Sequence, residues 1–273
     1  MASIAGRGGI ITVEDLRAAR TGAHSAEPSP GSPDETPATP LASGPLGATE
    51  VSDNVFEGTE GDDNDVFGEE TDDTVRGLGG NDYIWGGAGG IDRLEGGTGD
   101  DIYSVEDGDI VVELAGEGVD TVWWYGEAAA YAMTDNVENL HVSYRFDGVE
   151  VTGNALGNEI FGDYYDDTLR GMGGDDRLDG GWGVDRLIGG AGDDTYFVEQ
   201  NVYDDPTSVD VVVEAANEGI DTVYWYGEAA YQMTANVENI VVIGYSLQVT
   251  GNALNNDIES PATPTGTTWA PTR

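Results

Sequence analysis

A nine-residue pattern rich in glycine and aspartate recurs along this chain and limits its fold more than any other feature. The best copies read Gly-Gly-x-Gly-x-Asp-x-apolar-x, and a short fixed period is typical of stacked-repeat architectures. The copies fall into two blocks, and a degenerate copy at Gly58 precedes the first block. The other copies begin at Gly68, Gly77, Gly86 and Gly96, and at Gly153, Gly162, Gly171, Gly180 and Gly189.

The apolar residue at position eight of each copy indicates how such repeats build a core. One nonapeptide cannot bury this side chain, but stacked copies can, and glycine permits the sharp turn that precedes each short strand. The sequence therefore predicts an all-β fold, a parallel β-roll or β-solenoid built from glycine-rich nonapeptide repeats. The residues expected to point inward are Val75, Ile84, Leu94, Tyr103, Ile160, Leu169, Leu178, Leu187 and Tyr196.

A longer duplication accompanies the short repeat. The first block is followed by DIVVELAGEGVDTVWWYGEAAAYAMTDNVENLHV and the second by VDVVVEAANEGIDTVYWYGEAAYQMTANVENIVV. These segments are rich in Val, Ile, Trp and Tyr, so we expect short strands, with a helix as the alternative for Gly126–Thr134. Structural ladders at turns are the favoured role, over a functional one, for Asp120, Thr121, Asn139, Asp221, Thr222 and Asn239.

The aspartate at position six supplies the chemistry of the repeat. A tight turn exposes backbone carbonyls beside this carboxylate, and Ca²⁺ takes six to eight oxygen ligands at about 2.3–2.6 Å. Magnesium demands near-octahedral geometry and retains water, whereas iron and zinc favour His or Cys, which the repeats lack. The pattern therefore predicts calcium as the bound ion.

The charge balance agrees with a cation as the partner. Asp and Glu number 53 against 10 Lys and Arg, a formal net charge of −43, so the carboxylates repel one another unless neutralised. Disorder and a halophile-type surface are alternatives, but 38% hydrophobic residues and the regular spacing of the acids favour a folded, ion-binding chain. The composition argues against nucleic acid as a partner and against membrane insertion, and no cleavable N-terminal export signal is recognisable.

The repeats resemble the RTX, or haemolysin-type, calcium-binding repeats of bacterial secreted proteins, over about residues 58–104 and 153–198. The resemblance implies that alternate repeats stack on one side of the roll, with each ion between turns two repeats apart. The implied carboxylate pairs are Asp73 with Asp92, Asp82 with Asp101, Asp167 with Asp185, and Asp176 with Asp194, while Asp65 and Asn158 occupy weaker positions.

Several copies depart from the pattern. Those at Gly68 and Gly162 lack the second and fourth glycines, which predicts weaker binding. The copy at Gly86–Glu95 has one extra residue, which should bulge the roll and disturb the site of Asp73 and Asp92. Asn158 is neutral and should lower the affinity of any site that it shares.

Four regions are expected along the chain. Residues 1–50 hold a short amphipathic segment and a disordered linker rich in Pro, Ser and Gly; residues 51–152 and 153–258 are each an RTX block with an ion-free β segment; residues 259–273 form an irregular tail. A third block begins at Gly251 and then changes abruptly in composition, which fits a truncated or frameshifted piece of a larger exoprotein.

The expected function is calcium binding that drives folding of an exported bacterial protein or fragment, located outside the cell or at its surface. No HExxH or GxSxG motif is present, so an enzyme is not expected. Two alternatives stay open. One is a carbohydrate-binding or carbohydrate-active solenoid that stacks polysaccharide on Trp123–Tyr125 and Tyr224–Tyr226. The other is a structural or adhesive spacer at the cell surface.

Overall fold

The structure is a computed structural model that describes residues 49–52, 54–143, 145, 147–200, 208–243 and 248–260. These ranges contain strands and turns and no helix. The amphipathic segment and linker expected before residue 49, and the tail from residue 261, lie outside them. No helix able to span a membrane occurs in the described part of the chain.

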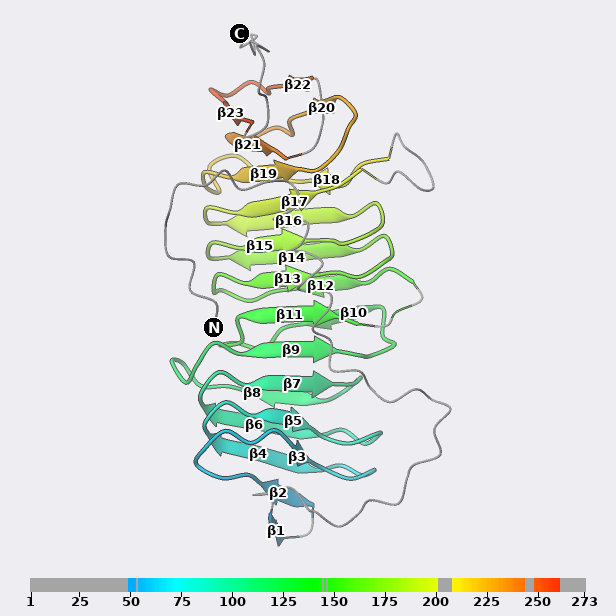
Figure 1. The fold of residues 1–273 in the computed structure, drawn as a ribbon, viewed down its shortest axis with the longest axis vertical. Coiled ribbons are helices and arrows are strands. Elements are labelled where there is room, and N and C mark those ends of the chain that lie inside the picture. Colours follow the sequence, from blue (N-terminus) through cyan, green and yellow to red (C-terminus); the bar gives the residue numbers. More distant parts are fainter. Residues whose placement is uncertain are drawn as a thin grey trace.

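One parallel sheet of eleven strands runs the length of the molecule (Figure 1). Successive strands of this sheet pair in order along the chain, so the coil advances one level at each turn. Its strands are β3 (Val66–Phe67), β5 (Tyr83–Trp85), β7 (Ile102–Val105), β9 (Thr121–Trp124), β11 (Asn139–Val142), β13 (Glu159–Phe161), β15 (Arg177–Asp179), β17 (Thr195–Val198), β19 (Thr222–Trp225), β21 (Asn239–Val242) and β23 (Asp257–Glu259).

The opposite wall consists of three shorter sheets. The first contains β1 (Thr49–Ser52), β2 (Val55–Glu57), β4 (Thr74–Gly79), β6 (Arg93–Thr98) and β8 (Ile110–Val112). The second contains β10 (Ala130–Ala132), β12 (Glu150–Thr152), β14 (Thr168–Gly173), β16 (Arg186–Ala191) and β18 (Val211–Val212). The third is β20 (Tyr231–Gln232) with β22 (Val249–Thr250). Every strand pair is parallel except β1 with β2.

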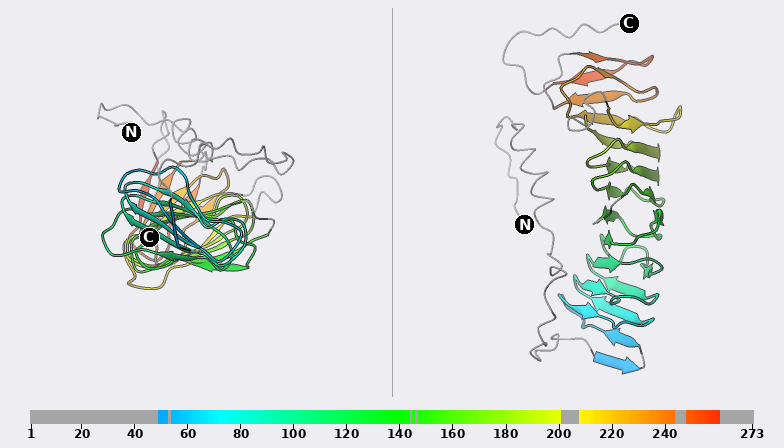
Figure 2. Two further views of the ribbon diagram at one scale, coloured as in Figure 1. Left: turned by 90° about the horizontal axis from the view of Figure 1, so that it is seen from below. Right: turned by 90° about the vertical axis from the view of Figure 1, so that its right-hand side faces the viewer.

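The two walls face each other across a narrow interior, as the side view of Figure 2 shows. The position-eight residues line this interior, and all nine are fully buried. Val122 and Leu140 continue the column between the two blocks, because Tyr103 pairs with Val122 and Leu140 with Ile160. The predicted all-β parallel solenoid is thus confirmed, and its core runs unbroken through both blocks.

The strand expected within Gly126–Thr134 is confirmed over the alternative helix, because Ala130–Ala132 is strand β10, paired with β12. The bulge expected from the extra residue of Gly86–Glu95 does not disturb the pairing of the neighbouring strands. Gly89 and Gly90 take φ values of 86° and 92° and absorb the residue in the turn, so Thr74 still pairs with Arg93.

Candidate metal centres

The position-six side chains form hydrogen-bonded ladders along the turns, and alternate copies in each block belong to different ladders. In each rung, the backbone N–H of one aspartate donates to Oδ1 of the aspartate one level on. All four implied pairs are brought together in this way. The N–H to Oδ1 distances are 2.8 Å for Asp73 with Asp92, 2.8 Å for Asp82 with Asp101, 2.7 Å for Asp167 with Asp185 and 2.8 Å for Asp176 with Asp194.

The ladders extend beyond the nonapeptides. Asp101 N donates to Asp120 Oδ1 at 2.9 Å, and Asp120 N donates to Glu138 Oε2 at 2.8 Å. In the second block, Asp194 N donates to Asp221 Oδ1 at 2.9 Å. Asp120 and Asp221 therefore do form rungs of a structural ladder, the role that the sequence favoured for them.

The remaining oxygen of each position-six residue divides the copies into two groups. Six aspartates, which we call the open aspartates, have a buried Oδ2 without a hydrogen-bond partner. They are Asp82, Asp92, Asp101, Asp176, Asp185 and Asp194. In the other copies a backbone N–H four residues earlier donates to this oxygen. These capped residues are Asp63, Asp73, Asn158 and Asp167.

The second residue of the copy explains this division. In every open copy it has a positive φ, which turns its N–H away from the aspartate; two such residues are not glycine, Leu78 at 79° and Met172 at 86°. In capped copies the second residue has an ordinary φ, and its N–H donates inward, as from Glu69 N to Asp73 Oδ2 at 2.5 Å. The copies that lack the second glycine at Gly68 and Gly162 are both capped.

The first glycine of each open copy lets the free oxygen approach its Cα closely, because a Cβ there would overlap Oδ2 of the following aspartate. A Cβ placed on Gly77 would lie 2.7 Å from the carbonyl oxygen of Gly96, one level on, and closer still to Oδ2 of Asp82. At Gly77 a carboxylate oxygen and a backbone carbonyl thus converge over a bare Cα. These are the oxygen ligands that Ca²⁺ prefers, and no nitrogen or sulfur ligand is needed.

Two of the weaker candidates do not share this geometry. Asp65 is exposed, and Asp63 takes the ladder position instead, with its N–H donating to Asp82 Oδ1 at 2.8 Å. Asp63 stands five residues after Gly58, the usual spacing, and one extra residue lies between it and β3. Asn158 is buried, but its amide nitrogen donates to the carbonyls of Val137 and Glu138 at 3.1 and 3.2 Å, so an N–H group fills the place where a cation would lie.

The open carboxyls resist ionisation when no cation is near. Burial raises the pKa of Asp82, Asp92 and Asp101 to about 6, against the lowering effect of the backbone N–H bond that each accepts. Burial raises the pKa of Asp185 to about 8, and the charge of Asp210 adds to the shift. The pKa of Asp176 is likewise raised by burial, to about 7. A bound cation would relieve this penalty.

The fold is therefore a parallel β-roll whose turns carry open carboxylates. Residues 67–90, 89–109 and 161–196 match the family model of the RTX calcium-binding nonapeptide repeat, in four copies. RTX repeats form a structural calcium-binding β-roll, and the proteins that contain them are typically exported by bacteria. No curated protein matches the chain.

Proposed function

We propose that this chain is a calcium-responsive folding module of an exported bacterial protein, with the open aspartates as its principal ligands. The observation that carries the proposal is the set of six buried, unpartnered carboxylate oxygens, each packed closely against the Cα of the first glycine of its copy. A buried carboxylate oxygen without a partner costs the folded state several kcal/mol unless a counter-charge is supplied. Calcium supplies that charge.

The coupling of binding to folding follows from how the ligands are distributed. The rungs between position-six residues of the nonapeptides join turns that are 18 or 19 residues apart in sequence, so the ligands converge only when the coil has formed. Extracellular calcium modules bind with Kd of about 10⁻⁴–10⁻³ M. A ligand at 100 times its Kd stabilises the folded state by about 2.7 kcal/mol per independent site, so several sites can decide the folding equilibrium.

The net charge of the chain explains why it would be expanded without calcium and folded with it. At the low calcium concentration of the cytosol, a net charge of −43 keeps the repeats expanded and suited to export. At millimolar calcium outside the cell, the ions neutralise the carboxylates and join neighbouring turns. The module would then be extracellular or attached to the cell surface.

Asparagine substitutions test which residues hold the ions. In Asp82→Asn and Asp176→Asn, the amide can still accept the ladder hydrogen bond through Oδ1, but it places an NH₂ group where the free oxygen was. We expect each variant to bind calcium at least tenfold more weakly at the altered turn. The matched control is Asp65→Asn, which changes the same charge at an exposed position.

Calorimetric titration of calcium into the full chain measures this effect. Wild type and Asp65→Asn should give the same isotherm, whereas Asp82→Asn and Asp176→Asn should each lose one tight site. If all three variants bind as wild type does, the open aspartates are not the ligands.

The aromatic clusters do not favour a carbohydrate ligand. Their middle residues, Trp124 and Trp225, are 1% and 0% exposed and stack on Tyr131 and Tyr231 inside the coil, with ring centroids 5.1 and 4.7 Å apart. Alternating burial along β9 and β19 accounts for these clusters, so stacking of a sugar across all three residues is excluded.

A further inference from the structure

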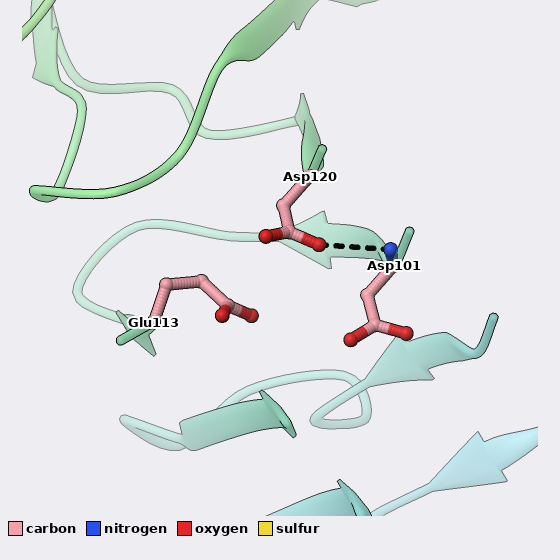
Figure 3. Close-up of side chains that lie close together, drawn as sticks. All are labelled: Asp101, Glu113 and Asp120. Carbon is pink, nitrogen blue, oxygen red and sulfur yellow. Dashed lines mark hydrogen bonds between the residues drawn. The ribbon is translucent and has the colours of Figure 1, made fainter. Parts of the chain in front are cut away.

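Each nonapeptide block ends at a buried group of three carboxylates and one tyrosine. The first group, the β8–β9 junction, contains Asp101, Glu113, Asp120 and Tyr103; the second, the β18–β19 junction, contains Asp194, Glu214, Asp221 and Tyr196. In each group, one oxygen from every carboxylate lies within 4.8 Å of those from the other two. Figure 3 shows the three carboxylates of the first junction turned toward a common point.

The glutamate of each junction stands where the repeat has its first glycine. Glu95 pairs with Val112 across β6 and β8, so the next residue, Gly96, faces Glu113. Leu187 pairs with Val212 across β16 and β18, which places Gly189 opposite Glu214. A side chain fits at this level because the following aspartate, Asp120 or Asp221, comes seven residues later instead of five.

The added residues form the same turn in both junctions. Gly116 has a φ of 84° and Asn217 a φ of 69°, and the N–H after each junction glutamate donates to a second glutamate, as from Leu114 N to Glu117 Oε2 at 2.8 Å. The equivalent bond from Ala215 N to Glu218 Oε2 is 2.7 Å long. The longer turn is thus a repeated, internally bonded structure that directs a carboxylate into the coil.

The junction carboxylates are buried and incompletely partnered. Asp101, Glu113 and Asp120 are 0%, 6% and 1% exposed. Tyr103 donates its hydroxyl hydrogen to Glu113 Oε1, which leaves Asp101 Oδ2 and Glu113 Oε2 without hydrogen-bond partners. Tyr196 donates to Glu214 Oε1 in the same way, and Asp194 Oδ2 and Glu214 Oε2 lack partners. The duplicated segments thus form the same arrangement at the end of both blocks.

The carboxylates of each junction oppose one another's ionisation. Burial raises the pKa of Glu113 to about 8, and the carboxylates of Asp120 and Asp101 add to the shift. Burial also raises the pKa of Glu214 to about 9, with further contributions from Asp221 and Asp194. Three carboxylates therefore share one dry site in each junction, and either protons or a metal ion must compensate their charge.

We propose that each junction binds one calcium ion, at a site distinct from those of the turns. Ligands about 2.3–2.6 Å from one ion lie up to about 5 Å apart, so three oxygens within 4.8 Å of one another can contact a single ion. The donors are carboxylate and phenol oxygens only, which suits a hard cation. Only Asp101 and Asp194 are shared with the turn sites; the glutamates and the later aspartates are additional.

Such an ion would join the two walls of the coil at the end of each block. Glu113 follows β8 in the shorter sheet, whereas Asp101 precedes β7 and Asp120 precedes β9 in the long sheet. The junction ion would therefore connect the last nonapeptide to the segment that follows it. The sequence predicted that the segments after the two blocks are free of ions. Each of them would instead contribute two ligands, a glutamate and an aspartate.

Glutamine substitution of both junction glutamates tests the proposal. Gln has the shape of a protonated Glu and can still accept the tyrosine hydrogen bond, so Glu113→Gln/Glu214→Gln should fold in saturating calcium. The matched control is Glu127→Gln/Glu228→Gln, which makes the same charge change at exposed residues of the same two segments. Bound calcium per full-length chain is measured by equilibrium dialysis followed by atomic emission, with circular dichroism as the check of folding.

We expect the junction variant to bind two calcium ions fewer than wild type and the control. If it binds the same number, protons fill the junctions and the proposal is overturned. The single variants Glu113→Gln and Glu214→Gln, each with one junction intact, should lose one ion each, and they provide the test if the double variant does not fold. If calcium occupied the junctions but not the turns, wild type would bind two ions and the junction variant would bind none.

Discussion

In calcium-free buffer, the chain should be unfolded at pH 8 and should gain strand structure as the pH is lowered to 5. The pKa of all six open carboxyls is raised in the folded state, to about 6 for Asp82, Asp92 and Asp101, about 7 for Asp176 and Asp194 and about 8 for Asp185. Because the unfolded value is about 3.9, the folded state binds more protons in this window. Stability from these groups is complete below pH 4 and is lost as the pH rises through 6 to 8.

Saturating calcium should reverse this dependence. The metal binds the deprotonated carboxylate, so protons compete with it and the calcium midpoint for folding should rise at least tenfold between pH 8 and pH 6. Far-ultraviolet circular dichroism follows both effects.

A salt control separates buried carboxyls from general surface repulsion. At 1 M NaCl, exposed charges are screened beyond about 3 Å, but buried groups are screened much less. Salt at pH 8 should therefore restore little of the structure that acid restores. If 1 M NaCl folds the calcium-free chain as completely as pH 5 does, surface charge and not the buried carboxyls controls folding.

Adding one methyl group at a first glycine should destroy a turn site. In Gly171→Ala, the new Cβ would overlap Oδ2 and Cγ of Asp176, and the aspartate cannot move without breaking its 2.7 Å bond from Asn158 N. Overpacking of this kind costs about 1–3 kcal/mol. We expect the unfolding free energy in calcium to fall by that amount, and calcium affinity at that turn to fall at least tenfold.

The same repeat offers a matched control. A Cβ on Gly173, two residues later, would meet only the carbonyl oxygen of Ala191, at 3.7 Å, and Gly173 does not have a positive φ. Gly173→Ala should stay within about 0.5 kcal/mol of wild type. Equal losses in the two variants, by urea unfolding at saturating calcium, would contradict the close approach of carboxylate to glycine.

The fold could be predicted because the same nonapeptide pattern occurs many times along the chain. The apolar residue at position eight recurs at the spacing of one strand per nonapeptide, and each of these residues is buried. The pairs of aspartates two repeats apart followed from the same stacking. The continuity of the core through residues 105–150 was less visible, because there the strands recur without glycine-rich turns to mark them.

Details of the turns could not be read from the pattern alone. Whether an aspartate is open or capped depends on the φ of the second residue, and Leu78 and Met172 adopt the left-handed conformation without being glycine. Asp65 was expected at a weaker site, but Asp63, five residues after Gly58, occupies the ladder position.

The junctions had a sequence signal that went unrecognised. Tyrosine occupies position eight only in the last copy of each block, at Tyr103 and Tyr196, and a glutamate follows at Glu113 and Glu214 in the duplicated segments. A polar group on an inward position, paired with a second one downstream, indicates a buried polar network. The turn that brings them together could not be inferred from spacing.

Circular dichroism during a calcium titration of the full chain is the most direct test of calcium-dependent folding. Starting from EDTA at pH 8, we expect a cooperative gain of strand signal with a midpoint of about 10⁻⁴–10⁻³ M calcium, no comparable gain with equimolar magnesium, and complete loss on renewed chelation. A strand signal that is already present in EDTA and unchanged by calcium would contradict the account.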